Sequence, residues 1–104
     1  MLTVIETAEF QTMARDVWDS ETHFAFVNFI ATNPEAGEVI PNSDGCRKVR
    51  WQASGRGKRG GSRVIYFNEM KDGLIVLLAV YAKNKQTNMR RETVRKLKNE
   101  AEKH

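Results

Sequence analysis

The sequence has few of the residues that disulfides and metal sites require. Among its 104 residues are one cysteine, Cys46, and two histidines, His23 and His104. A single cysteine excludes an internal disulfide, and one thiol with two imidazoles is too little for an ordinary structural zinc site. We therefore expect neither a metal nor any other cofactor, and we expect Cys46 to be a small buried residue.

Long apolar runs are also missing. The longest, from Leu74 to Ala82, is far shorter than the roughly 20 residues of a membrane helix, and the N-terminus lacks a signal-peptide pattern. Hydrophobic residues make up 40% and charged residues 29%, which are ordinary proportions for a soluble globular protein. The sequence therefore predicts one cytoplasmic domain over residues 1–104 with no membrane partner.

Acidic residues are absent between Gly45 and Asn68. The net charge of +4 hides this asymmetry, because residues 1–44 carry a charge of −7 and residues 45–104 carry +11. Each Lys or Arg placed on a phosphate releases condensed counterions, so such a segment is typical of a polyanion binder. A solvated charged surface is the alternative, and it is less favoured here because the acids that would balance it are missing.

Apolar residues at helical spacing predict three helices. One covers residues 10–17, a second runs from an N-cap at Asp19 or Ser20 to Asn33-Pro34, and a third begins near Thr87 or Asn88. His23 lies on the apolar stripe of the second helix, so we expect it to serve packing rather than catalysis.

Four segments are predicted as strands: residues 3–6, 46–52, 63–68 and 74–81. The last is apolar throughout, as a central strand would be, and Asp72-Gly73 is a hairpin turn signal before it. Residues 34–45 are predicted to form a loop. The order βααβββα predicts an α+β domain with a small antiparallel-rich sheet, two N-terminal helices packed on one side, and a C-terminal helix.

The segment from Gly55 to Arg63 joins two predicted strands with glycines and four cations. It lacks the Gly-Lys-Ser/Thr ending of a phosphate-binding P-loop, and glycine-rich hairpin loops often only turn the chain. Its flanks favour a function, because a three-strand meander would bring further cations to it. The residues predicted to bind RNA are Arg47, Lys48, Arg50, Arg56, Arg59, Tyr66 and Lys85.

A basic basin of this kind can cleave RNA without a metal if the 2′-hydroxyl of the RNA attacks the adjacent phosphate. The reaction needs a proton acceptor, stabilisation of charge on the phosphorane, and a proton donor to the leaving 5′-oxygen. Arg63 is suited to charge stabilisation because arginine stays protonated. Lys58 or Lys83, surrounded by cations, are candidate proton carriers, and Tyr66 or Tyr81 can donate a proton or stack on a base.

Several segments together resemble the HigB-type branch of the RelE toxin superfamily. These are Pro34, Gly37 and Val39-Ile40-Pro41; Gly45 to Trp51; Gly57 to Phe67, with its Gly-Lys-Arg-Gly-Gly-Ser-Arg run; and Tyr81-Ala82-Lys83-Asn84. The resemblance covers nearly the whole chain. The sequence departs from it at Asn42 to Cys46, where relatives more often read Gly-Thr-Gly-Gly-Leu.

The resemblance implies a RelE-like fold and the toxin of a type II toxin–antitoxin system. Such a toxin is a metal-independent endoribonuclease that cuts translated mRNA on the ribosome, and an antitoxin with a helix-turn-helix DNA-binding domain inhibits it. By position, Arg63 matches the phosphate-stabilising arginine of the family, and Lys58, Arg59, Tyr81 and Lys83 match positions near its active site.

Two other functions use the same features. A non-catalytic regulator that binds RNA or DNA would keep the basic face without needing Arg63, Lys58 and Tyr81 to converge. A structural or assembly protein would leave the charge of +11 without a purpose.

Overall fold

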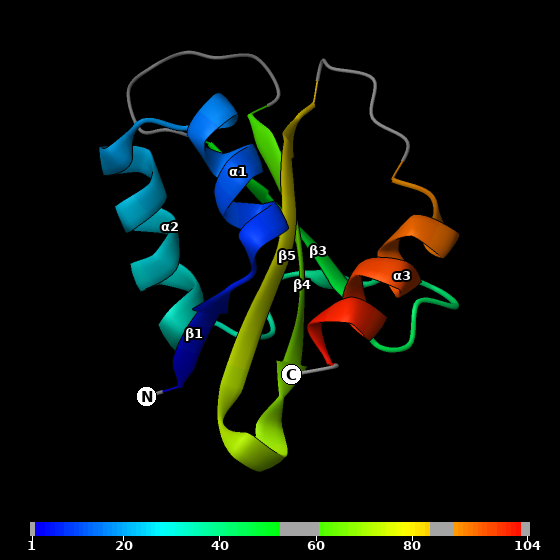
Figure 1. Cartoon of the computed structure of the whole chain (residues 1–104). Helices are drawn as coiled ribbons and strands as arrows, with labels where there is room; N and C mark the ends of the chain where they lie inside the picture. Colours follow the sequence, from blue (N-terminus) through cyan, green and yellow to red (C-terminus); the bar gives the residue numbers. More distant parts are fainter. Residues whose placement is uncertain (1, 53–60, 84–88, 103–104) are drawn as a thin grey trace.

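The structure is a computed structural model that describes residues 2–52, 61–83 and 89–102 (Figure 1). Its described helices are α1 (Ala8–Val17), α2 (Ser20–Thr32), the short 3-10 helix η1 (Met70–Asp72) and α3 (Arg91–Ala101). Its described strands are β1 (Thr3–Glu6), β2 (Glu38–Val39), β3 (Arg47–Trp51), β4 (Ser62–Glu69) and β5 (Leu74–Ala82). The predicted α+β class is therefore confirmed, and the order differs from βααβββα only by β2 and η1.

Side chains at the starts of α1 and α2 fix where these helices begin. The hydroxyl of Thr7 accepts a hydrogen bond from the backbone N–H of Phe10, and the carboxylate of Asp19 accepts one from the N–H of Thr22. Such caps satisfy N–H groups that have no partner within the helix. Asp19 is thus the N-cap of α2, one of the two residues predicted for that role.

The five strands form one sheet in the order β1-β5-β4-β3-β2. Neighbours are antiparallel except β1, which pairs with β5 in parallel from Thr3↔Leu74 to Glu6↔Leu77. Beyond that point α1 takes the place of β1 and runs beside the rest of β5 (Figure 1). β5 is accordingly a covered inner strand, as its apolar run predicts. The stretch predicted as a loop contains β2, which pairs only through Glu38 and Val39.

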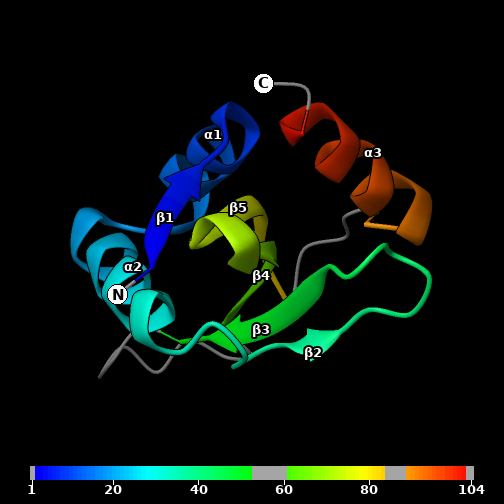
Figure 2. The same ribbon diagram turned by 90° about the horizontal axis from the view of Figure 1, so that it is seen from below.

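Two clusters of buried side chains lie on opposite faces of the sheet. On the α2 face, Phe10 of α1 and Phe26 of α2 pack on β3, β4 and β5. On the α3 face, Val94 of α3 packs on Ile65 and Phe67 of β4 and on residues of β5. Figure 2 shows α2 and α3 on either side of the sheet. The helices therefore cover both faces, with α1 and α2 on one and α3 on the other.

A β-bulge lies in the middle of the β4–β5 pair. Ile65 pairs with Ala79 and Tyr66 pairs with Leu77, so Leu78 is an extra residue on β5. An extra residue reverses the alternation of side chains along the strand that carries it. After the bulge, the odd-numbered residues of β5 share the α3 face, whereas before it Ile75 and Leu77 belong to the α2 face.

No helix within the described ranges is long and apolar enough to cross a membrane.

Candidate nucleic-acid interface

Three predicted site residues lie side by side across the sheet. Arg50 of β3 is opposite Arg63 of β4, which is opposite Tyr81 of β5. Directly opposite residues point to the same face, with Cβ atoms about 5 Å apart in antiparallel pairs. Ile65, two residues beyond Arg63, belongs to the α3-side cluster, as does Tyr81. We call the set Arg50, Arg63 and Tyr81 the cationic row, and it lies on the α3 face.

The members of the cationic row differ in exposure. Arg50 is exposed, while Arg63 and Tyr81 are half-buried. Burial raises the pKa of the Tyr81 phenol, and the positive charge of Arg63 lowers it by a smaller amount. The phenol therefore stays protonated at neutral pH, where it can donate a hydrogen bond. The direct pairing of Arg63 with Tyr81 puts the two side chains next to each other on this face.

Two exposed lysines extend the row. Lys48 lies two residues before Arg50, so alternation along β3 places it on the same face. Lys83 follows β5, and its backbone N–H donates to the carbonyl of Gly61 at 3.1 Å, which continues the β4–β5 pairing by one residue. By the same alternation Lys83 shares the face of Tyr81. Strands β3 and β4 and the residue after β5 thus place cations on one face, and those of β3 and β4 lie in the stretch without acids between Gly45 and Asn68.

Four predicted site residues, Arg56, Lys58, Arg59 and Lys85, lie outside the described residues. Lys58 is among those predicted to be catalytic, and its role stays a prediction.

Two predicted RNA-binding residues do not join the row. Arg47 and Tyr66 face each other across β3 and β4, on the α2 face. Tyr66 is fully buried; its hydroxyl donates to the carbonyl of Pro34 at 2.8 Å and accepts from the N–H of Gly37 at 2.9 Å. The guanidinium of Arg47 donates to the carbonyl of Gly37 at 2.7 Å. These polar groups are used within the chain. Because Tyr66 is fully buried, its ring has no face free to stack on a base.

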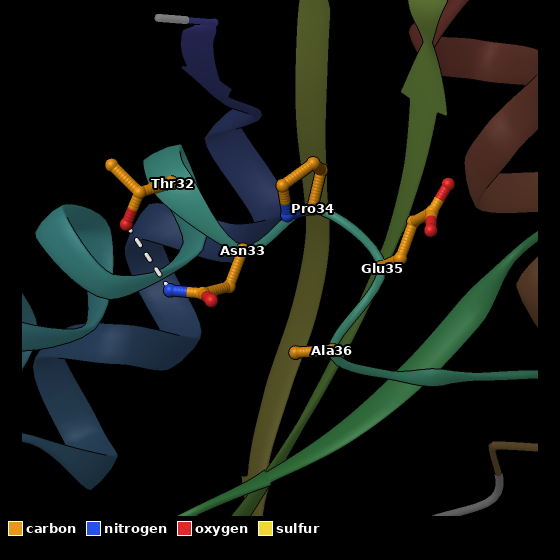
Figure 3. A pocket seen from close by; sticks show the side chains of 5 residues that line it. All are labelled: Thr32, Asn33, Pro34, Glu35 and Ala36. Atoms are coloured by element: carbon orange, nitrogen blue, oxygen red, sulfur yellow. Dashed lines mark hydrogen bonds between the residues drawn. The ribbon is translucent and has the colours of Figure 1, made fainter.

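The segment that Tyr66 holds also forms a shallow depression at the end of α2. Figure 3 shows its lining, which consists of Thr32, Asn33, Pro34, Glu35 and Ala36. Its one ionisable side chain is an acid, Glu35. This depression contains none of the predicted site residues, and its charge does not suit a phosphate.

The two residues expected to be structural behave as such. The imidazole of His23 lies 2.7 Å from the carboxylate of Glu6 and packs against the rings of Phe10 and Trp18. Cys46 is fully buried, which raises the pKa of its thiol to about 11. In the part of the chain that the structure describes, no three His, Cys, Asp or Glu residues gather as a metal site would require.

Sequence reasoning missed a polar contact behind the row. The indole N–H of Trp18 donates to the hydroxyl of Ser62 at 2.9 Å, and this hydroxyl donates to the carbonyl of Trp51 at 3.0 Å. Trp18 follows α1, and Ser62 directly precedes Arg63. No local sequence signal predicts the contact, because 44 residues separate the indole from the hydroxyl.

No family model matches the sequence. Among solved structures, the chain is similar to the E. coli toxin RelE in the free state, in a form with two arginine-to-alanine substitutions. The identity is 14%, the TM-score is 0.59, and the match covers 98% of this chain and 95% of that one.

Two further structures give the same result. One is the isolated E. coli RelE toxin, at 16% identity and a TM-score of 0.57, with 93% of this chain and 99% of that chain covered. The other is the intact E. coli RelBE toxin–antitoxin complex, at 15% identity and a TM-score of 0.57, with 83% and 100% covered. The predicted RelE-like fold is therefore confirmed, and at these identities the likeness is one of fold.

Proposed function

We propose that this protein is the toxin of a type II toxin–antitoxin system, a ribosome-dependent endoribonuclease of the HigB type that cleaves translated mRNA and so inhibits translation. The observation that carries the proposal is the cationic row, in which Arg50, Arg63 and Tyr81 occupy adjacent positions on three strands. The RelE-like fold supports it, as do the solved neighbours described as toxins.

In the proposed reaction, the 2′-oxygen of one nucleotide forms a bond to the adjacent phosphorus while the bond from phosphorus to the 5′-oxygen breaks. The products are a 2′,3′-cyclic phosphate and a 5′-hydroxyl. Negative charge on the non-bridging oxygens rises in the transition state, so fixed cations beside them lower the barrier. Arg63 serves this purpose with two N–H donors in one plane, and Arg50 lies directly opposite to share the charge.

The reaction also moves two protons, one from the 2′-hydroxyl and one to the leaving 5′-oxygen. Tyr81 is protonated at neutral pH, as a phenol ordinarily is, and burial raises its pKa further, so it suits the donor step or a hydrogen bond to the phosphate. We assign the acceptor step to a lysine, Lys58 or Lys83, the two candidate proton carriers of the sequence. Lys48 and the cations at positions 56, 59 and 85 would bind the RNA backbone.

We also propose two macromolecular partners besides mRNA, namely the ribosome and a cognate antitoxin with a helix-turn-helix DNA-binding domain. The RelBE neighbour is a toxin–antitoxin complex, which supports an antitoxin for this chain. The site of action would be the cytoplasm, where translation occurs.

The test is cleavage of a defined mRNA on purified translating ribosomes, with the cut position mapped by primer extension. Arg63→Ala should lower the single-turnover cleavage rate by about 100-fold, since removal of one transition-state donor typically costs that much. Lys71→Ala is the matched control; it also removes one cation, but from exposed η1 at the other end of β4. This control should cleave at the wild-type rate.

Two results would contradict the proposal. An intact mRNA after incubation with the wild-type protein, together with RNA or DNA binding, would favour the non-catalytic regulator. Full cleavage by a folded Arg63→Ala variant would remove the cationic row from the mechanism.

A further inference from the structure

The contact between Trp18, Ser62 and Trp51 lies at the point where the sheet ends beside the cationic row. Trp51 and Ser62 are the last pair of the β3–β4 ladder, and Arg50 and Arg63 are the pair next to it. One hydroxyl joins three elements here, because Ser62 accepts from the indole of Trp18 and donates to the carbonyl of Trp51. Ser62 is 3% exposed, so water cannot easily replace either hydrogen bond.

The position of this contact matters because the two residues of the neighbouring pair, Arg50 and Arg63, repel each other. Arg50 and Arg63 carry like charges on directly opposite residues, an arrangement that weakens a strand pair. Only one further pair, Trp51 with Ser62, separates these arginines from the end of the ladder. Without the hydrogen bonds of Ser62 at this pair, β3 and β4 would separate most easily beside the two arginines, where the proposed site needs both guanidinium groups close together.

The indole of Trp18 is itself held firmly. Its ring packs against Phe26, with centroids 5.3 Å apart, and against Phe10 at 6.0 Å. Phe10 and Phe26 are both fully buried. The hydrogen bonds of Ser62 therefore connect the end of the β3–β4 ladder to the core on the α2 face, whereas the arginines point to the α3 face.

We propose that Trp18 and Ser62 are positioning residues, whose hydrogen bonds hold Arg50 and Arg63 at the separation that one RNA phosphate requires. The inference deepens the proposed function and rests on it for the identity of the ligand. Neither residue needs to touch RNA. Both act through the backbone of Trp51 and Ser62, the residues adjacent to Arg50 and Arg63.

The test uses two single variants and their combination. Trp18→Phe keeps an aromatic ring but removes the N–H donor, and Ser62→Ala removes the hydroxyl. The double variant has neither polar group, so it leaves no unsatisfied indole N–H and should recover stability lost in Ser62→Ala. Thr12→Ala is the control, since it also removes one hydroxyl hydrogen bond, from Thr12 to the carbonyl of Ala8 on the exposed side of α1.

The first measurement is a titration of the two tyrosines by NMR with labelled phenol carbons, which requires no RNA. Tyr81→Phe identifies the Tyr81 signal by its loss. Arg63 lowers the pKa of Tyr81 in the native protein, so displacement of Arg63 should raise that pKa further in the double variant. The Thr12→Ala control should leave it unchanged, and Tyr66 should titrate as in the native protein in every variant.

The second measurement is single-turnover cleavage on ribosomes. The double variant should lose about tenfold in rate at saturating ribosome concentration, a modest loss for a displaced catalytic group, with little change in half-saturation. In an Arg63→Ala background the same two substitutions should cause no further loss. An unchanged Tyr81 titration and rate in the folded double variant would overturn the inference. If the native protein cleaves no RNA, the proposed function fails, and the titration alone then decides the inference.

Discussion

The two faces of the β3–β4–β5 sheet differ sharply at the end where β3 and β5 finish. On the α2 face, the Trp51 ring packs against Phe26 and Phe29, with centroids 5.3 and 4.9 Å apart, and Ser62 is buried beside it. One residue further along, on the α3 face, Arg50 and Arg63 stand opposite each other. The same strands thus build a closed core on one face and present cations on the other. At this end of the sheet the charged side chains are therefore kept apart from the apolar core of the α2 face.

The two tyrosines show the same difference within single side chains. Tyr66 is buried on the α2 face and uses its hydroxyl to hold Pro34 and Gly37. Tyr81 is half-buried on the α3 face beside Arg63. Both tyrosines were predicted as site residues, but only Tyr81 has part of its side chain exposed to a ligand.

The largest expected effect is a loss of stability from a substitution in the core of the α2 face. Phe26→Ala should lower the free energy of unfolding by about 4 kcal/mol, because it removes a fully buried ring from the α2-side core. Lys48→Ala, on the exposed side of β3, should change it by less than about 0.5 kcal/mol. Urea denaturation of both variants measures the difference. Equal losses would mean that the two faces do not divide stability and function in this way.

Removal of the hydroxyl should affect cleavage at one tyrosine and stability at the other. Tyr81→Phe should lower ribosome-dependent cleavage by about 100-fold, as loss of a proton donor does, with little loss of stability. Tyr66→Phe should lower the free energy of unfolding by about 1–2 kcal/mol, because the buried N–H of Gly37 loses its partner, and should leave the cleavage rate nearly unchanged. The reverse assignment of effects would place the active phenol on the α2 face.

The smallest expected effect concerns the covered part of the α3 face, where Cys46 is buried. The pKa of its thiol rises from 9.0 to about 11 on folding. The unfolded chain therefore loses the thiol proton above pH 9 while the folded chain keeps it. Stability from this residue is complete below pH 9 and is lost as pH rises toward 11, by about 2 kcal/mol.

Denaturation of the native protein and of Cys46→Ala between pH 8 and 11 measures this effect, since the difference between them should fall across that interval. A constant difference would mean that the thiol is reached by water and that α3 does not cover this part of the sheet.

Much of the fold follows from local sequence signals. The N-cap at Asp19, the inner position of β5 and the turn near Gly73 all depend on neighbouring residues, and the structure contains each of them. The parallel pairing of β1 with β5 depends on contacts between residues far apart in sequence, which no local pattern encodes. β2 is too short to leave an alternation of its own.

Which candidate site residues share a face was predictable where alternation alone decides it. Arg50 and Lys48 share a face because one residue, Val49, lies between them. The same rule places Tyr66 on the other face of β4 from Arg63, because the two positions differ by three. Tyr81 is a different case. It reaches the α3 face only because Leu78 is an extra residue in β5, and an apolar run gives no sign of where a bulge lies.

The most direct test of the account is a double-mutant cycle between Arg50 and Arg63, measured as cleavage of mRNA on translating ribosomes. If both guanidinium groups act on one phosphate, their effects are coupled, and the double Arg50→Ala/Arg63→Ala variant should lose clearly less than the product of the two single losses. Strictly independent losses in folded variants would mean that the two arginines serve different phosphates, which would contradict the cationic row as a single site.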